Sequence, residues 1–120
     1  MTNLYDETIE TLENHDKTIA DIEYIGTLRT KINTNKALEL MKKTNYDSGY
    51  GRQEIACNLM IKGADFIMTR GEYDGSEWWV YRQTNPSLPQ VESDVKSFKT
   101  NDIWYNCLEE INGLEDTKND

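Results

Sequence analysis

The dipeptide Asp74-Gly75 is the feature that most constrains the fold of this chain. It separates two segments, residues 66–73 and 76–83, that are rich in aromatic and β-branched side chains. An Asp-Gly pair between two such segments is the strongest short-range signal for a β-hairpin with a two-residue type I′ turn. The sequence therefore predicts an antiparallel strand pair in the middle of the domain.

A two-residue turn also fixes the register of the hairpin, so its cross-strand pairs can be counted outward from the turn. Side chains alternate between the two faces of a strand, which places Trp78 and Trp79 on opposite faces. At most one of the two tryptophans belongs to the core, and the other either packs under a terminal helix or is an exposed anchor for a partner. The predicted pairs are Tyr73–Ser76, Glu72–Glu77, Gly71–Trp78, Arg70–Trp79 and Met68–Tyr81.

The predicted register sets two carboxylates, Glu72 and Glu77, directly opposite each other. Like charges at such a pair are destabilising unless a cation neutralises them, and Arg70 is the nearest candidate. A close carboxylate pair can act as a catalytic acid and base, or it can belong to a partner-binding surface. The structural interpretation, which we favour, is that both glutamates are solvated or that Arg70 bridges them.

Helical periodicity, caps and turn residues divide the rest of the chain. Helices are predicted over residues 3–15, with a cap at Thr2 or Asn3, over 33–43, and from 100–102 to a C′ glycine at Gly113. Further strands are predicted over residues 21–32 and 55–62, whereas 91–99 are either a short helix or an irregular crossing. We expect one compact α+β domain over 1–120, with a frayed acidic tail at 114–120. Its antiparallel sheet of three to four strands packs with two to four helices, in the rough order α-β-α-β-β-β-α.

The negative charge of the chain belongs to its two ends. The net charge is -9, and residues 1–25 hold seven acidic side chains and one basic one, whereas residues 101–120 hold six and one. Within the first predicted helix, Asp6, Glu10 and Glu13 share one face because they are four and three residues apart. These acidic ends are either solvated helix faces or a surface that binds a basic partner.

Several functional classes lack support in the sequence. The acidic balance argues against direct nucleic-acid binding, and no apolar run approaches the length of a membrane span. His15, the single histidine, is placed to cap the first helix, and Cys57 and Cys107 lie in apolar patterns typical of buried thiols. The glycines of residues 46–51 lack the Gly-Lys-Ser/Thr ending of a phosphate loop. We predict no cofactor, no metal site and no catalytic residues.

Two motifs carry a resemblance to known proteins. They are YDSGYGRQEI at residues 46–55 and EYDGSEWW at 72–79, with Arg70 just before the second, and HDKT at 15–18 followed by DIEYIG at 21–26 adds to them. Together they resemble a family of small phage and prophage proteins of Firmicutes that has no assigned function. The chain departs from the family pattern at Phe66-Ile67, where a tryptophan pair is usual, and at Gly71, where a bulkier residue is. The resemblance implies a mobile-element protein that acts in the cytoplasm of a bacterial host.

The resemblance and the acidity together suggest an inhibitor of host defence. We expect a non-enzymatic, anti-CRISPR-like protein whose carboxylates imitate nucleic acid in the basic channel of a host nuclease. The alternative is a regulatory or assembly adaptor of the phage cycle that binds a protein through the hairpin aromatics, and a third possibility is a small hydrolase that uses Glu72 and Glu77. The predicted partner-binding residues are Asp6, Glu10, Glu13, Glu72, Asp74, Glu77, Trp78, Trp79, Glu109 and Glu110.

Overall fold

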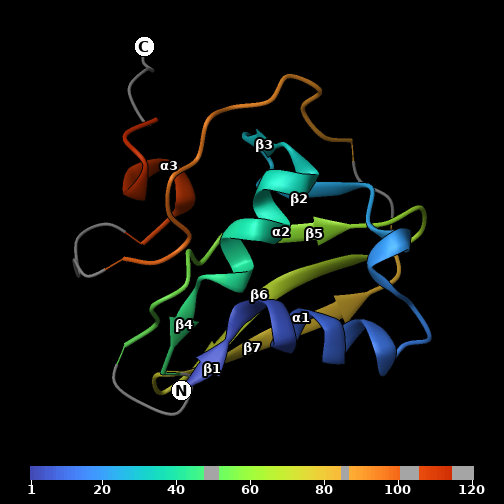
Figure 1. Ribbon diagram of the computed structural model, residues 1–120, viewed down its shortest axis with the longest axis horizontal. Helices are drawn as coiled ribbons and strands as arrows, with labels where there is room; N and C mark the ends of the chain where they lie inside the picture. Colours follow the sequence, from blue (N-terminus) through green and yellow to red (C-terminus); the bar gives the residue numbers. More distant parts are fainter. Residues whose placement is uncertain (48–51, 85–86, 101–105, 115–120) are drawn as a thin grey trace.

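The fold is α+β, as predicted, and the computed structural model describes residues 1–47, 52–84, 87–100 and 106–114 (Figure 1). The helices are α1 (Leu4–Glu13), α2 (Thr34–Lys42) and α3 (Leu108–Ile111), with one turn of 3-10 helix at Ile19–Asp21. The strands are β1 (Thr2–Asn3), β2 (Tyr24–Gly26), β3 (Lys31–Ile32), β4 (Asn45–Tyr46), β5 (Met60–Lys62), β6 (Ile67–Tyr73) and β7 (Ser76–Arg82).

A five-stranded antiparallel sheet in the order β3-β2-β5-β6-β7 forms the body of the molecule, so the predicted count of three to four strands is too low, and β1 pairs with β4 in a second, two-stranded sheet. Helices α1 and α2 lie side by side on one face of the larger sheet (Figure 1). The core fills the space between these helices and the sheet. It includes Leu12 of α1, Met41 of α2 and, from the sheet, Ile25, Ile61 and Met68, all fully buried.

The β6–β7 hairpin has the predicted register at every pair, from Tyr73–Ser76 to Met68–Tyr81. Asp74 and Gly75 have φ angles of 54° and 87°, as a type I′ turn requires at both central positions. Alternation along the strands then turns Met68, Arg70 and Trp79 toward the helices, which decides between the two faces that the sequence left open.

Both predicted N-terminal helices are confirmed, and each begins at an asparagine cap. The Asn3 side chain accepts a hydrogen bond from the backbone N–H of Asp6, and the Asn33 side chain accepts one from Lys36 at 3.1 Å. A cap of this kind satisfies one of the donors that a helix N-terminus leaves unpaired.

The prediction of one strand over residues 21–32 is wrong, because the chain folds back within it. The Thr18 and Asp21 side chains close a capping box around the 3-10 turn, so β2 begins only at Tyr24. After β2 the chain reverses in a turn closed by a hydrogen bond from Thr27 N–H to the Thr30 carbonyl (2.8 Å). Gly26 permits this reversal, because a Cβ at that position would lie 2.0 Å from the Thr30 oxygen.

Only the end of the predicted strand over residues 55–62 is a strand, β5, because backbone N–H groups in its first half donate hydrogen bonds to segments outside the sheet. The backbone N–H of Ala56 donates to Phe98 (2.7 Å) and that of Cys57 donates to Asn106 (2.8 Å), so Cys57 lies in a turn and not on a strand. Residues 91–99 are the irregular crossing that was one of the two expectations, held by single bridges at Glu92 and Lys99.

The predicted C-terminal helix is shorter than expected. Asn106 and Cys107 are not helical, α3 begins at Leu108, and Gly113 follows its C-cap with a φ of 69°, as predicted. The rest of the predicted helix, at 101–105, lies outside the described residues, as do 48–51 of the glycine-containing loop and 115–120 of the tail. A single compact domain with a frayed tail therefore stays a prediction. No helix within the described residues has the length and apolar character that crossing a membrane requires.

Replacing the α2 cap tests the local origin of this helix. We expect Asn33→Ala to lower the free energy of unfolding by about 1 kcal/mol, because the Lys36 N–H loses its acceptor. Urea denaturation followed by circular dichroism measures the change. Asn35→Ala, an exposed residue in the first turn of the same helix, is the control and should have no such cost. Equal stability of the two variants would show that the cap is unimportant.

Candidate functional site

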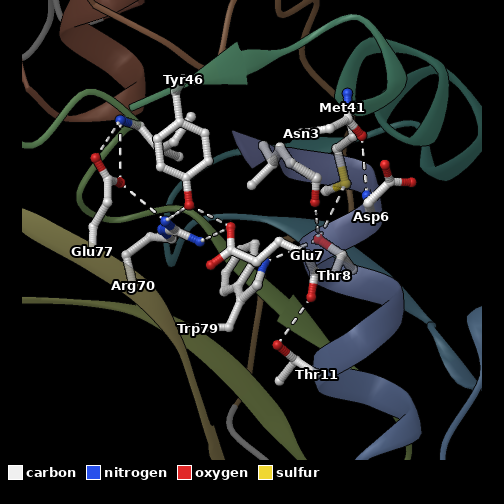
Figure 2. A network of polar contacts seen from close by, with 12 residues as sticks. Asn3, Asp6, Glu7, Thr8, Thr11, Met41, Tyr46, Arg70, Glu77 and Trp79 are labelled. Carbon is white, nitrogen blue, oxygen red and sulfur yellow. Dashed lines mark hydrogen bonds and ion pairs between the residues drawn. The ribbon is translucent and has the colours of Figure 1, made fainter. Parts of the chain in front are cut away.

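A buried cation, Arg70, lies at the centre of the inner sheet face. Its guanidinium donates to Oε1 of Glu77 and to the Tyr46 hydroxyl, both at 3.0 Å, and to Oε1 of Glu7 at 3.3 Å. Figure 2 shows the guanidinium between these three partners. The Arg70 side chain has no solvent-exposed surface, and these acceptors replace the hydration of its two terminal nitrogens, whereas its buried Nε has no hydrogen-bond partner among the described residues.

Four separate elements meet at this Arg70 cluster, which we define as Glu7, Tyr46, Arg70, Glu77 and Trp79. They come from α1, β4, β6 and β7, and the guanidinium also stacks 4.7 Å from the centre of the Trp79 ring. The Tyr46 hydroxyl donates to Glu7, which closes a ring of charge-assisted bonds. The cluster therefore fixes how α1 packs on the hairpin.

The cluster also holds a segment that lacks regular structure. Both backbone N–H groups of Glu54 and Ile55 donate to the Glu77 carboxylate, the first at 2.6 Å. Burial raises the pKa of the Glu77 carboxyl, while these N–H groups and Arg70 oppose the rise. Burial likewise raises the pKa of the Tyr46 hydroxyl. Both carboxylate oxygens of Glu77 thus accept hydrogen bonds from within the protein.

The two glutamates that face each other in the hairpin have different environments. Glu77 is buried on Arg70, whereas Glu72 is exposed and accepts a hydrogen bond from the backbone N–H of Gly75 (2.8 Å) in the turn. Arg70 neutralises Glu77, and the turn donates a hydrogen bond to Glu72. Among the described residues the two glutamates share no partner, so the geometry of the pair gives no support for acid–base chemistry.

A second buried carboxylate, Glu109, attaches α3 to the rest of the molecule. It accepts from the hydroxyls of Thr27 (2.5 Å) and Thr30 (2.6 Å) and from the side-chain amide of Asn58 (2.8 Å), and it pairs with Arg29 at 3.1 Å. Burial alone would raise its pKa, but the hydrogen bonds from Thr27, Thr30 and Asn58 outweigh that effect and lower the pKa to about 2. Glu109 is therefore an ionised anchor for a helix of four residues.

Three of the ten predicted partner-binding residues are buried, which corrects their expected exposure. Glu77 and Glu109 are each 3% exposed because they neutralise or bond internal donors, and Trp79 is 5% exposed because its indole N–H donates to Thr8 of α1 at 2.9 Å. Glu110 is half-buried and accepts from the backbone N–H of Cys107, so it caps α3. The exposed members are Asp6, Glu10, Glu13, Glu72, Asp74 and Trp78.

Asp6, Glu10 and Glu13 form a row along the outer face of α1, opposite the buried Leu4, Thr8 and Leu12. We call this set the acidic row. None of its three carboxylates makes an ion pair with another described residue. Helix α3 lies at the other end of the molecule from α1 (Figure 1), so the described acidic ends do not merge into one surface.

Trp78 points away from the helices, as alternation requires, and is 42% exposed. Tyr73 lies on the same outer face of the hairpin and is 77% exposed. The Trp78 indole lies against Gly71 of β6, where a Cβ would come within 2.9 Å of its Nε1. Of the two tryptophans, Trp78 is thus the one available to a partner.

His15, Cys57 and Cys107 are other described residues whose side chains could take part in catalysis or metal binding by type. His15 Nδ1 lies 3.0 Å from the Thr11 carbonyl in the last turn of α1, as predicted for a cap, and its ring stacks on Tyr81. Burial raises the pKa of the half-buried thiols of Cys57 and Cys107, which makes both weaker nucleophiles. Within the described ranges, no group of three or more His, Cys, Asp or Glu side chains is arranged to hold a metal ion.

Sequence reasoning proposed Arg70 as the cation for Glu77, which the structure shows, but it missed the other partners of Arg70 and the partners of Glu109. Arg70 faces inward between Met68 and Trp79, and an inward cation requires acceptors, but nothing in the sequence points to Glu7 or Tyr46 as those acceptors. Comparison with known proteins adds no further assignment: no family model, no curated protein and no solved structure matches the chain. The resemblance to phage proteins stays a prediction.

Removing the buried cation tests the Arg70 cluster. We expect Arg70→Met to lower the free energy of unfolding by about 3–5 kcal/mol, because it leaves the Glu77 carboxylate buried without its cation. The double variant Arg70→Met/Glu77→Gln should recover part of this loss. Arg52→Met, at an exposed arginine, is the control for chemical denaturation. A loss below about 1 kcal/mol in Arg70→Met would contradict the assignment.

The depressed pKa of Glu109 predicts a specific acid sensitivity. Its folded pKa of about 2 lies below the ordinary value of 4.5, so its contribution is complete above pH 4.5 and is lost as the pH falls toward 2. We expect the stability difference between wild type and Glu109→Gln to narrow by about 3 kcal/mol across this range. Urea titrations at a series of pH values measure it, with Glu13→Gln on the outer face of α1 as the control. A difference independent of pH would refute the prediction.

Proposed function

We propose that this chain is a non-enzymatic inhibitor of a host defence nuclease, of the anti-CRISPR kind, acting in the bacterial cytoplasm. In this proposal the acidic row occupies a basic channel that otherwise holds nucleic acid. The observation that carries the proposal is the presence of three exposed carboxylates on one helix face that form no ion pair with any residue the structure describes. An unpaired charge keeps its full attraction for an external cation.

The spacing of the acidic row supports electrostatic mimicry. At ~1.5 Å rise per residue, Asp6, Glu10 and Glu13 lie ~6 and ~4.5 Å apart along the helix axis. Duplex DNA carries a charge about every 1.7 Å over both strands, so the row reproduces part of that field. Glu72 and Asp74 add exposed carboxylates at the tip of the β6–β7 hairpin. The same hairpin is bonded to α1, because its Arg70 donates to Glu7.

The rigidity of α1 also supports the proposal. Glu7 and Thr8, on the inner side of the helix, are bonded to Arg70 and Trp79. A helix fixed in this way loses little conformational freedom on binding, which favours affinity. The acidic row is thus presented on a prearranged support.

A second candidate function rests on a different observation. Trp78 and Tyr73 are exposed on the face of the hairpin that α1 and α2 leave uncovered. Exposed aromatic side chains of this kind are common anchors in protein interfaces. An adaptor of the phage cycle that binds a protein through this face is therefore the alternative.

Charge neutralisation tests the first proposal. Guide-loaded CRISPR nucleases from Firmicutes serve as the probe, and inhibition of DNA cleavage is measured at increasing salt. We expect Asp6→Asn/Glu10→Gln/Glu13→Gln to weaken inhibition about tenfold, because three screened ion pairs are lost. The matched control, Glu23→Gln/Asp65→Asn/Asp94→Asn, removes the same charge from other exposed positions.

The outcomes separate the two candidate functions. Affinity that falls as salt rises, together with loss only in the acidic-row variant, supports the nuclease inhibitor. Affinity indifferent to salt, or equal loss in both triple variants, refutes mimicry by this row. If Trp78→Ala abolishes binding while the fold and the acidic row stay intact, the adaptor is favoured instead.

A further inference from the structure

A cavity of about 550 Å³ opens on the sheet face that α1 and α2 do not cover. Met60, Ile67 and Thr69 form its floor, and they alternate with Ile61 and Met68, which point into the core on the other side. The volume lies in the range of sites that bind small molecules, about 300–1,000 Å³. The cavity is separate from the acidic row, because the sheet lies between them.

The walls of the cavity are mostly apolar. Leu28, in the turn between β2 and β3, forms one side and is 66% exposed, while the Cys57 turn forms another. Its remaining lining residues are Thr27, Arg29, Asn58 and Thr84. An apolar surface with a few polar groups at its margin is the usual composition of a ligand site.

Two arginines, Arg29 and Arg82, lie at this cavity, in a chain where acidic residues outnumber basic ones 22 to 13. Arg29 belongs to the lining, and its guanidinium is positioned by the buried Glu109 at 3.1 Å. Arg82 is paired with Ile67 in the hairpin register, so it lies on the same face, and it donates to the hydroxyl of the lining Thr69 at 3.4 Å. Among the described residues, those that line the cavity include no acidic side chain, although the buried Glu109 bonds three of them, Thr27, Arg29 and Asn58.

We propose that this cavity binds a small apolar molecule that carries a carboxylate. The apolar body lies on Met60, Ile67 and Leu28, and the carboxylate is attracted by the exposed Arg82, because Arg29 is already paired with Glu109. A guanidinium suits this role because its planar N–H groups match the two oxygens of a carboxylate. The site does not depend on the proposed nuclease inhibition.

A pair of isosteric probes tests the proposal directly. 2-Naphthoate carries the carboxylate, and 2-naphthamide has the same ring without the charge, so their dissociation constants from calorimetry isolate the anionic contribution. We expect saturable one-to-one binding of naphthoate, about two- to fivefold tighter than naphthamide. Arg82→Gln should remove most of this preference, Arg82→Lys should retain it in part, and Arg52→Gln should leave it unchanged.

The two cysteines provide a second measurement within the same molecule. Cys57 lines the cavity and Cys107 does not, so naphthoate should slow the alkylation of Cys57 by iodoacetamide and leave Cys107 unaffected. Peptide mass spectrometry distinguishes the two sites. Absence of saturable binding, or equal protection of both thiols, would overturn the cavity as a ligand site. Equal affinity for the two probes, or a preference that survives in Arg82→Gln, would overturn the carboxylate assignment.

Discussion

The fold depends on how the protein accommodates one fully buried positive charge. A guanidinium removed from water is costly unless acceptors surround it, and those of Arg70 come from segments that are distant in the sequence. Glu7 is 63 residues away and Tyr46 is 24 residues away. The charge can be buried only when α1, β4 and the hairpin have all assembled, so it links local structure to the complete fold.

At the other end of the molecule, a buried negative charge likewise joins segments that are distant in the sequence. Glu109 brings together the β2–β3 turn, Asn58 and the short α3, none of which has extensive regular structure of its own. In this domain, buried charged side chains hold together segments that longer strands would hold together in other folds. The sheet face opposite α1 and α2 carries Trp78 and the cavity beside Arg29 and Arg82.

The elements that could be predicted from the sequence are those with local causes. The hairpin register follows from a two-residue turn, and α1 and α2 follow from their asparagine caps and apolar spacing. The strand at 55–62 could not be predicted fully, because the hydrogen bonds of Ala56 and Cys57 go to residues more than forty positions later. Likewise, the exposure of the acidic row follows from helical periodicity, whereas the burial of Glu77 and Glu109 depends on distant donors that periodicity does not show.

The contact between Gly71 and Trp78 makes two positions in adjacent strands behave as one unit. A side chain at position 71 would meet both the indole and the Val80 side chain, at 2.9 and 2.8 Å from its Cβ, so the ring would have to lift from the sheet. The identity of residue 71 therefore sets how flat the outer face of the hairpin is and how much of the indole it displays. A larger residue here would therefore give a differently shaped aromatic surface even with the same tryptophan.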